Sequence, residues 1–269
     1  MVGVCGENTW GQRMQSRLAA ARAVRAVRRG ASLNRALPEV LTKTDADAHA
    51  TIQALSYGVL RRYELIEALL ALLLKKPLKR KDEIVTDLLR VALFELLDSA
   101  KPDYAVVDSV VDLVKRERRW ASGLANGVLR RFLRERESLV QAALEQPSAR
   151  YLLPDWLLGK LRKAWPDSFE DLAAALAEPA PMTLRVDLSR VERDVYLQRL
   201  GTEGIQATPH VSVPSAIVLQ SPGDIRQLPG FEEGEVSVQD AAAQLAGWLL
   251  DLKPGLRALD ACAAPGGKT

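Results

Sequence analysis

The sequence predicts a multi-domain chain: an all-α helical bundle, then a small α+β module, then the first strand and loop of a parallel α/β domain. Apolar residues recur at helical spacing from Met14 to Glu145, whereas helix and strand signals alternate after Pro147. The segment Asp260–Thr269 is a loop of small residues and glycine that follows a strand-like stretch. The predicted divisions are a disordered tail over 1–13, the bundle over 14–147, the module over 148–234 and the start of the α/β domain over 235–269.

The composition is that of a globular protein, with 48% hydrophobic and 26% charged residues. The longest apolar run, Leu69–Leu74, is far shorter than the roughly 18 residues that a membrane span requires, and the N-terminus lacks a secretion signal. We therefore expect a cytoplasmic protein with no part in a membrane. Cys5 and Cys262 lie far apart and the two histidines are isolated, so we expect no disulfide framework and no metal site.

Charge is unevenly distributed along the chain. Residues 1–150 contain 26 Lys and Arg against 18 Asp and Glu, a net charge of +8, whereas residues 151–269 contain 11 against 16, a net charge of −5. A basic half joined to a mildly acidic half is typical of a nucleic-acid-contacting module attached to another unit. A solvated, arginine-rich helical surface would have the same composition, and charge alone does not separate the two interpretations.

The basic half is predicted to form helices separated by short breaks. In the first helix Leu18, Ala21 and Val24 repeat at helical spacing, and Gly30 ends it. Ser32 is a candidate N-cap for the next helix. Later helices are predicted over 47–62, 63–74, 82–97, 104–115, 120–133 and 138–145.

The character of the sequence changes after Pro147. Two helices are predicted over 151–178, with Trp156 and Trp165 at helix breaks as core anchors, and the prolines at 179–181 end the helical run. Strands over 182–186, 205–207 and 216–219 and a helix over 191–200 then indicate a small α+β module.

The final segment is predicted to open an α/β domain. Val236–Val238 is a short strand, Asp240 caps a helix that runs to about Leu252, and Leu256–Leu259 is a second strand. Gly266 and Gly267 in the loop that follows would let the backbone approach a ligand closely, as at nucleotide sites on the edge of a parallel sheet.

Two other interpretations of this loop compete with a cofactor site. Gly267-Lys268-Thr269 matches the end of a phosphate-binding P-loop, but Cys262 stands where that signature requires glycine, which disfavours a nucleotide hydrolase. A tight strand-to-helix turn without a ligand would explain a lone pair of glycines, but the match described next is longer than that pair.

The loop and its surroundings resemble a known enzyme family. Asp260–Thr269, preceded by Val236–Gln244, is similar to the first cofactor motif of the NOL1/NOP2/Sun family of RNA 5-methylcytosine methyltransferases. Pro181–Asp187 resembles the start of the family's small RNA-contacting module, with Asp187 in place of the usual asparagine.

The resemblance extends through the basic half, from Met14 onward. Leu74–Leu78, Asp103–Val107 and Gly123–Arg131 are similar to the NusB-like helical domain that precedes the catalytic domain in the family's bacterial 16S rRNA enzymes. A non-catalytic, NusB-like RNA-binding or antitermination-type module is the alternative, although such a module would have no reason to carry the motif at Asp260–Thr269.

The resemblance implies a Rossmann-like methyltransferase domain of which this chain holds only the start, with S-adenosylmethionine as cofactor and 16S rRNA as partner. Family enzymes add a cysteine thiolate to C6 of cytosine so that C5 can accept a methyl group. That nucleophile is expected beyond Thr269, so we expect the chain to bind RNA without methylating it. The residues implied to bind the cofactor are Cys262, Ala263, Ala264, Pro265, Gly266, Gly267 and Lys268.

Clustered arginines are candidate contacts to RNA phosphates. A solvated charged face is the more common explanation of any single arginine, but as a set they favour RNA. The predicted contacts are Arg25, Arg28, Arg29, Arg118, Arg119, Arg130, Arg131 and Arg185, with Lys115, Arg116 and Arg134 beside them. The aromatic residues Tyr57, Phe94 and Phe132 are predicted to lie in the core.

Overall fold

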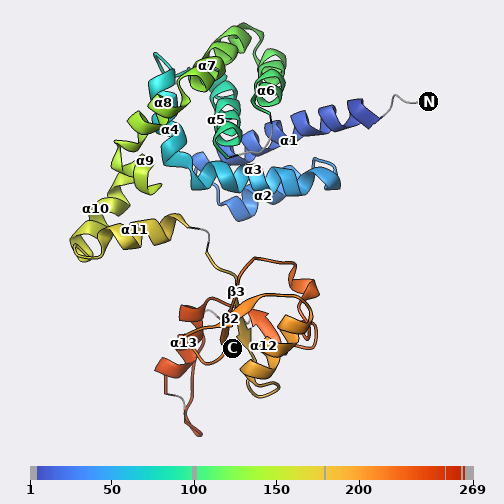
Figure 1. Ribbon diagram of the computed structural model, residues 1–269, viewed down its shortest axis with the longest axis vertical. Helices are drawn as coiled ribbons and strands as arrows, with labels where there is room; N and C mark the ends of the chain where they lie inside the picture. Colours follow the sequence, from blue (N-terminus) through green and yellow to red (C-terminus); the bar gives the residue numbers. More distant parts are fainter. Residues whose placement is uncertain (1–4, 99–101, 179, 252, 262, 264–269) are drawn as a thin grey trace. The chain divides into compact units, whose positions relative to one another are not determined.

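The computed structural model describes residues 5–98, 102–178, 180–251, 253–261 and 263. The chain divides into two compact units, residues 1–178 and residues 179–269, and each is described by itself. The first unit is helical and the second is built around a small sheet (Figure 1).

The first unit confirms the helical bundle. Its α-helices are α1 (Cys5–Arg28), α2 (Leu33–Leu41), α3 (His49–Arg61), α4 (Tyr63–Leu73), α5 (Glu83–Asp98), α6 (Asp103–Glu117), α7 (Ser122–Arg134), α8 (Arg136–Leu144), α9 (Pro147–Tyr151), α10 (Asp155–Ala164) and α11 (Phe169–Ala177). Three short 3₁₀ turns lie between them: η1 (Ala46–Ala48), η2 (Arg80–Asp82) and η3 (Arg119–Ala121).

Helix α5 is the centre of this unit. Leu88, Leu89, Val91 and Leu93 are fully buried, and α5 contacts α1, α3, α4, α6 and α7. A helix that is apolar on nearly every side is stable only when other helices surround it. Phe132 of α7 completes the core and is fully buried, as the sequence predicts.

Two glycines shape the helix contacts. Gly58 lets α3 approach α5, because a Cβ built at this position would lie 2.0 Å from the ring of Phe94. Gly30 has a φ of +97°, a left-handed conformation that glycine adopts without strain. It ends α1 as predicted, and the amide of Ala31 donates to the carbonyl of Ala26 to close the last turn.

Buried ion pairs fasten α1 to α5. The carboxylate of Asp87 is fully buried and accepts from Arg25 Nε at 2.6 Å, Arg28 Nη1 at 3.1 Å and Arg90 Nη1 at 2.7 Å. Arg90 also donates twice to Glu67 of α4, at 2.6 and 3.1 Å. A buried carboxylate is tolerated only when it is paired in this way, so these contacts fix how the two helices dock.

A second buried pair lies further along the same interface. Arg17 Nε of α1 donates to Glu95 Oε2 of α5 at 2.5 Å, and both side chains are almost completely buried. Arg17 and Glu95 lie 78 positions apart in the sequence, so the periodicity of either helix could not predict this ion pair.

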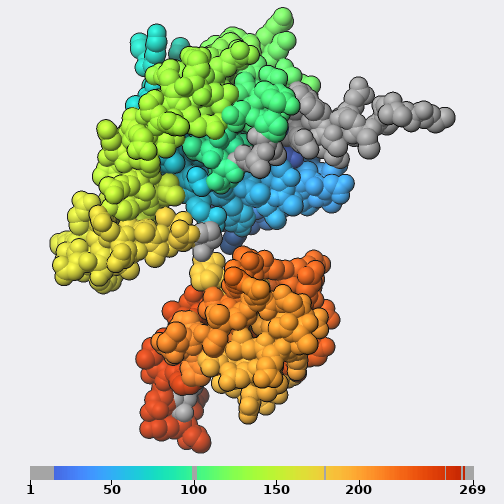
Figure 2. All heavy atoms as spheres, in the orientation of Figure 1, coloured from blue at the N-terminus to red at the C-terminus, as the bar shows by residue number. Residues whose placement is uncertain are grey.

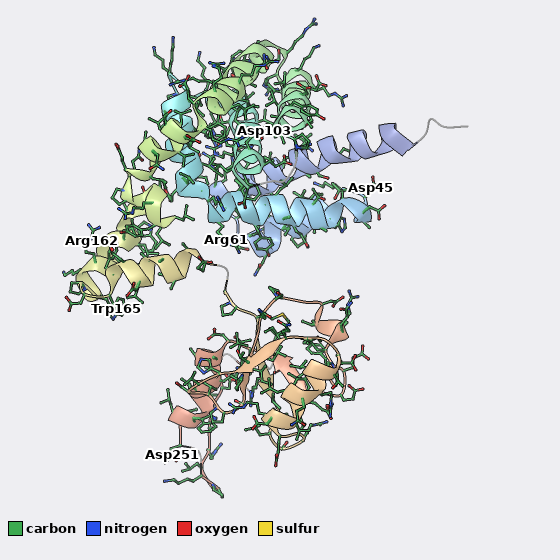
Figure 3. The ribbon with its side chains drawn as sticks, in the orientation of Figure 1. Asp45, Arg61, Asp103, Arg162, Trp165 and Asp251 are labelled. Carbon is green, nitrogen blue, oxygen red and sulfur yellow. The ribbon has the colours of Figure 1, made fainter. Side chains whose placement is uncertain are left out.

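Two aromatic predictions are wrong for the short helices after α8. Trp156 and Trp165 are 64% and 55% exposed, and Figure 3 shows Trp165 at the margin of its unit. The local core is made by Leu158, Leu161 and Phe169, and Trp156 lies two residues before Leu158, on a different side of α10. The same error affects Tyr57, which is 47% exposed on α3, whereas Phe94 is partly buried against the core as predicted.

The second unit is a four-stranded antiparallel sheet with helices. Its strands are β1 (Thr183–Val186), β2 (Ala207–Pro209), β3 (Ala216–Leu219) and β4 (Val236–Val238), in the order β2-β3-β1-β4. Helix α12 (Arg193–Thr202) buries Tyr196 and Leu200 against Leu184 and Ile217 of the sheet. The Tyr196 hydroxyl donates to the carbonyl of Pro229 at 2.8 Å. The small α+β module predicted from the sequence is therefore present.

Strand β4 and helix α13 (Ala241–Leu249) are fastened to this sheet. Leu184 of β1 pairs with Val238 of β4, and Gln244 Nε2 donates to the carbonyls of Leu184 and Gln239 at 3.3 and 3.0 Å. Asp240 caps α13 as predicted, because its side chain accepts from the amides of Ala242 and Ala243. The division predicted at residue 235 therefore falls inside the sheet module.

Two further expectations are wrong. Leu256–Leu259 is not a strand; no strand in the described part of the chain pairs with it, and Leu259 is 91% exposed. A strand needs a neighbour for its backbone hydrogen bonds. At the other end, Cys5–Arg13 belong to α1 rather than to a disordered tail, because the segment contains glycine but no proline to interrupt the helix.

We predict that Asp87→Asn destabilises the helical unit by about 3–5 kcal/mol, because Arg90 and Arg25 lose the charge that compensates them. Urea unfolding followed by far-ultraviolet circular dichroism would measure this. Asp108→Asn is the matched control, since Asp108 is an exposed residue of α6, and it should change stability by less than about 0.5 kcal/mol. Equal midpoints for the two variants would contradict the importance of the network.

Burial raises the pKa of Tyr196 to about 12. Its neutral form is therefore favoured in the folded sheet module, and this stabilisation is complete below the unfolded pKa of about 10 and is lost as pH rises through about 12. In an absorbance titration at 295 nm, Tyr196→Phe should remove the last tyrosine to ionise. Tyr104→Phe, which removes a 70% exposed tyrosine, should leave that last step in place.

Candidate nucleic-acid interface

The predicted cofactor loop lies almost wholly outside the described residues. Cys262, Ala264, Pro265, Gly266, Gly267 and Lys268 are not described, and Ala263 is exposed and in no regular element. The cofactor-binding role of these seven residues therefore stays a prediction.

The structure brings Arg25, Arg28 and Arg29 together at the end of α1, but against carboxylates. Arg28 donates to Asp87, Glu83 and the hydroxyl of Tyr63, and Arg29 Nη2 lies 2.6 Å from Glu83 Oε2. Burial opposes ionisation of Glu83, but the hydrogen bond from Arg29 and the nearby arginine charges outweigh it and lower its pKa. RNA phosphates would have to replace these ion pairs, although the half-exposed Arg29 keeps part of its surface free.

Arg118 joins two segments that lie far apart in the sequence. Its Nε donates to Asp82 Oδ1 at 3.1 Å and its Nη2 to the carbonyl of Lys81 at 2.9 Å, so the turn after α6 is held against η2. Its guanidinium is thus a structural clamp, whereas Arg119 next to it is exposed.

Arg130, Arg131 and Arg134 lie on α7, and two of them have partners in the same unit. Arg130 donates to Asn126, and Arg131 donates to Glu135 and to the carbonyl of Leu72. Arg130 and Arg134 also line a groove of about 570 Å³ with Tyr104. The same groove contains Asp103 and Asp108, whose negative charges would repel a polyanionic ligand.

A basic surface lies at the two segments that Arg118 joins, and we call it the basic end. It comprises Lys75, Lys76, Lys79, Arg80 and Lys81 from the segment between α4 and α5, with Lys115 and Arg116 from the last turn of α6 and Arg119 from η3. All eight side chains belong to exposed residues, and within the described ranges none makes an ion pair. Both segments lie at the upper edge of the helical unit in Figures 1 and 2.

The sequence explains why this loop presents its charges to solvent. Leu74 and Leu78 are partly buried against the core and anchor the loop at two points, while Pro77 prevents α4 from continuing. The lysines before and after these anchors, Lys75, Lys76, Lys79 and Lys81, are exposed to solvent. The lysine and arginine residues at 79–81 were missed as site residues, although the charge run in this segment was a signal for them.

A pocket connects the basic end to the arginines of α1. It has a volume of about 560 Å³ and is lined by Lys75 and Arg80 from the loop and by Arg28, Glu83 and Arg90 from the ion-pair network. The pocket also contains Glu67 and several apolar side chains, so its lining is mixed and not uniformly basic.

In the sheet unit Arg185 lies on β1 beside a second, polar pocket. Its Nη1 donates to Gln239 Oε1 at 3.4 Å, and the pocket of about 250 Å³ also contains Asp187, Ser189 and Trp248. Hydrogen bonds from Ser189 lower the pKa of Asp187, so this aspartate is held as an anion beside the predicted RNA contact Arg185.

The described residues contain neither a candidate membrane span nor a candidate metal site. No helix there is long and apolar enough to cross a membrane. No group of three or more His, Cys, Asp or Glu residues in the same part of the chain is arranged to hold a metal ion.

Two family models match the chain. Residues 14–134 match the model of the NusB family, and residues 153–226 match the model described as the methyltransferase RsmF/B-like, ferredoxin-like domain. The ferredoxin-like match begins at residue 153, whereas the two compact units of the structure divide at residue 178. The domain boundary predicted at residue 147 therefore stays a prediction.

The curated relatives are ribosomal RNA small subunit methyltransferase B proteins. The chain is 45% identical to that of Pseudomonas syringae pv. tomato over 258 residues, which cover 95% of this chain and 58% of the relative. It is 40% identical to that of Vibrio vulnificus over 260 residues, which cover 95% and 61%. The chain thus spans about three fifths of the length of these relatives. The crystal structure of PH0851 has a similar fold, with a TM-score of 0.64 and 20% identity, and the match covers 95% of this chain and 59% of that one.

We predict that Lys79→Gln combined with Lys81→Gln weakens binding of single-stranded RNA and lowers the slope of log affinity against log salt by roughly 0.7 for each lost phosphate contact. Fluorescence anisotropy at several salt concentrations would measure both quantities. The matched control is Lys43→Gln with Lys163→Gln, which removes two exposed lysines elsewhere in the helical unit. Equal slopes for both double variants would exclude the basic end from RNA binding.

Proposed function

We propose that this chain, which joins a NusB-family domain to an RsmF/B-like ferredoxin-like domain, is the RNA-binding part of an S-adenosylmethionine-dependent methyltransferase that forms 5-methylcytosine in 16S rRNA. The observation that carries the proposal is this pair of domains in a chain 38–45% identical to small subunit rRNA methyltransferases. Because the substrate is rRNA, the protein would act in the cytoplasm.

The RNA-binding role is supported by the electrostatics of the helical unit. The basic end concentrates cations that lack a partner among the described residues, and neutralised phosphates release counterions when such a surface binds RNA. Arg119 and the lysines of the loop are the main contacts in this proposal, and Arg29 and Arg134 are secondary ones. Arg25, Arg28 and Arg118 act instead by holding helices and loops in place.

In the sheet unit Arg185 is the proposed RNA contact. It is part of β1, which pairs on both sides, so its backbone position is fixed by the two neighbouring strands. Gln239 orients its guanidinium, and the exposed indole of Trp248 borders the same pocket.

In this proposal the chemical step requires a cofactor and a nucleophile in addition to the RNA-binding residues. S-adenosylmethionine would provide the methyl group, and the residues proposed to hold it are those at 262–268, on the sequence resemblance alone. The nucleophilic cysteine of the family is matched by neither Cys5 nor Cys262, since Cys5 precedes the residues that match the NusB family and Cys262 belongs to the proposed cofactor motif. We therefore propose that the chain alone binds RNA without methylating it.

A non-catalytic RNA-binding module is the second candidate, because the NusB-family match alone would suit it. The ferredoxin-like match over residues 153–226 favours the methyltransferase, since its description names that enzyme group.

We predict that deleting the gene for this protein removes one 5-methylcytosine from 16S rRNA, which bisulfite sequencing of the rRNA would detect. Restoring the 269-residue chain should not restore the modification, and the purified chain should transfer no radiolabelled methyl group from S-adenosylmethionine to 16S rRNA. An unchanged bisulfite pattern in the deletion strain would contradict the proposed reaction. Methyl transfer by the chain alone would contradict the assignment of the nucleophile to a segment outside it.

A further inference from the structure

An exposed tryptophan, Trp120, directly follows Arg119 of the basic end. Trp120 is the central residue of η3 and 60% of its surface is exposed. Its neighbour Ala121 is fully buried, so η3 is fixed to the core through the alanine and not through the indole. Arg118, two residues before it, holds η3 against Lys81. The indole therefore belongs to a turn that Ala121 and Arg118 hold in place, and the exposed Arg119 is adjacent to it.

A structural role does not account for Trp120. An indole is a large apolar surface whose exposure to water is unfavourable, and here most of it is left outside the core. Among the described residues no cation lies over the ring of Trp120, whereas Lys160 Nζ lies 5.4 Å from the centre of the Trp156 ring. The aromatic face of Trp120 thus has no partner of that kind in this structure.

We propose that Trp120 is a stacking platform for an unpaired base of the bound RNA, with the phosphates on either side of that base contacting Arg119 and the lysines of the adjoining loop. The inference rests on the proposed function, because it takes the basic end to be an RNA-binding surface. It adds that the helical unit recognises single-stranded or looped RNA.

The chemistry of the surface selects this ligand over a duplex. In an A-form duplex the bases are stacked on one another and their faces are closed to a protein side chain, whereas an unpaired base can lie on an aromatic ring. Each such contact strengthens binding by about tenfold, and every base can make it, so the preference is for strandedness and not for sequence. An acidic protein would satisfy the cations but has no aromatic base to place on Trp120.

The test compares Trp120→Ala with the wild-type chain on a fluorescein-labelled 12-nucleotide oligoadenylate and on the same strand in a duplex with oligouridylate. Binding to the single strand should weaken by about tenfold, whereas duplex binding should change by less than about twofold. Trp120→Tyr should retain most of the single-strand affinity. Trp156→Ala, which removes an equally exposed tryptophan outside the basic end, is the matched control and should leave both affinities unchanged. Thermal unfolding monitors the fold of each variant.

The outcomes separate this inference from the function on which it rests. If Trp120→Ala binds the single strand as tightly as the wild type, the stacking role is overturned while RNA binding by the basic end stands. If the wild-type chain binds neither oligoadenylate nor 16S rRNA, the proposed function of the helical unit fails as well. If polyglutamate displaces the single strand as effectively as unlabelled oligoadenylate does, the surface recognises charge alone and the proposal is overturned.

Discussion

The buried carboxylate of Asp87 is the constraint on which the helical unit depends. An anion without access to water must be surrounded by donors, and Arg25, Arg28 and Arg90 supply them from two helices. Arg90 carries the connection on to Glu67 of α4. These ion pairs therefore hold the three helices together in addition to their apolar contacts. They also pair Arg25 and Arg28 of α1 with a carboxylate inside the unit, whereas the cations of the basic end have no such partner among the described residues.

The regular elements were predictable from the sequence wherever a single helix face or strand sets the pattern. Ala216–Leu219 is a strand as predicted, Gly30 ends α1, and Asp240 caps α13, because each depends on residues close together in the chain. The candidate site was less predictable. Arg28 looks like a phosphate contact in the sequence, and only the fold reveals that Glu83 and Asp87 lie beside it.

Tertiary context also explains two predictions that were wrong, the strand at Leu256–Leu259 and the buried tryptophans Trp156 and Trp165. Leu256–Leu259 has the composition of a strand, but a strand forms only beside another, and its composition does not reveal whether a neighbour is present. Trp156 and Trp165 were predicted to be core anchors at helix breaks, yet the small core there is made by Leu158, Leu161 and Phe169. Strand β4 joined the sheet of β1 because their registers match, a pairing that no local pattern could predict.

The contact between Gly58 and Phe94 has an evolutionary consequence. Helices α3 and α5 approach so closely there that any side chain at position 58 would overlap the aromatic ring. A change at position 58 therefore disturbs the packing least in a lineage that has already exchanged Phe94 for a smaller residue. The reverse order requires the ring of Phe94 to move from its present position. The two positions should accordingly drift as a pair, with position 94 changing first.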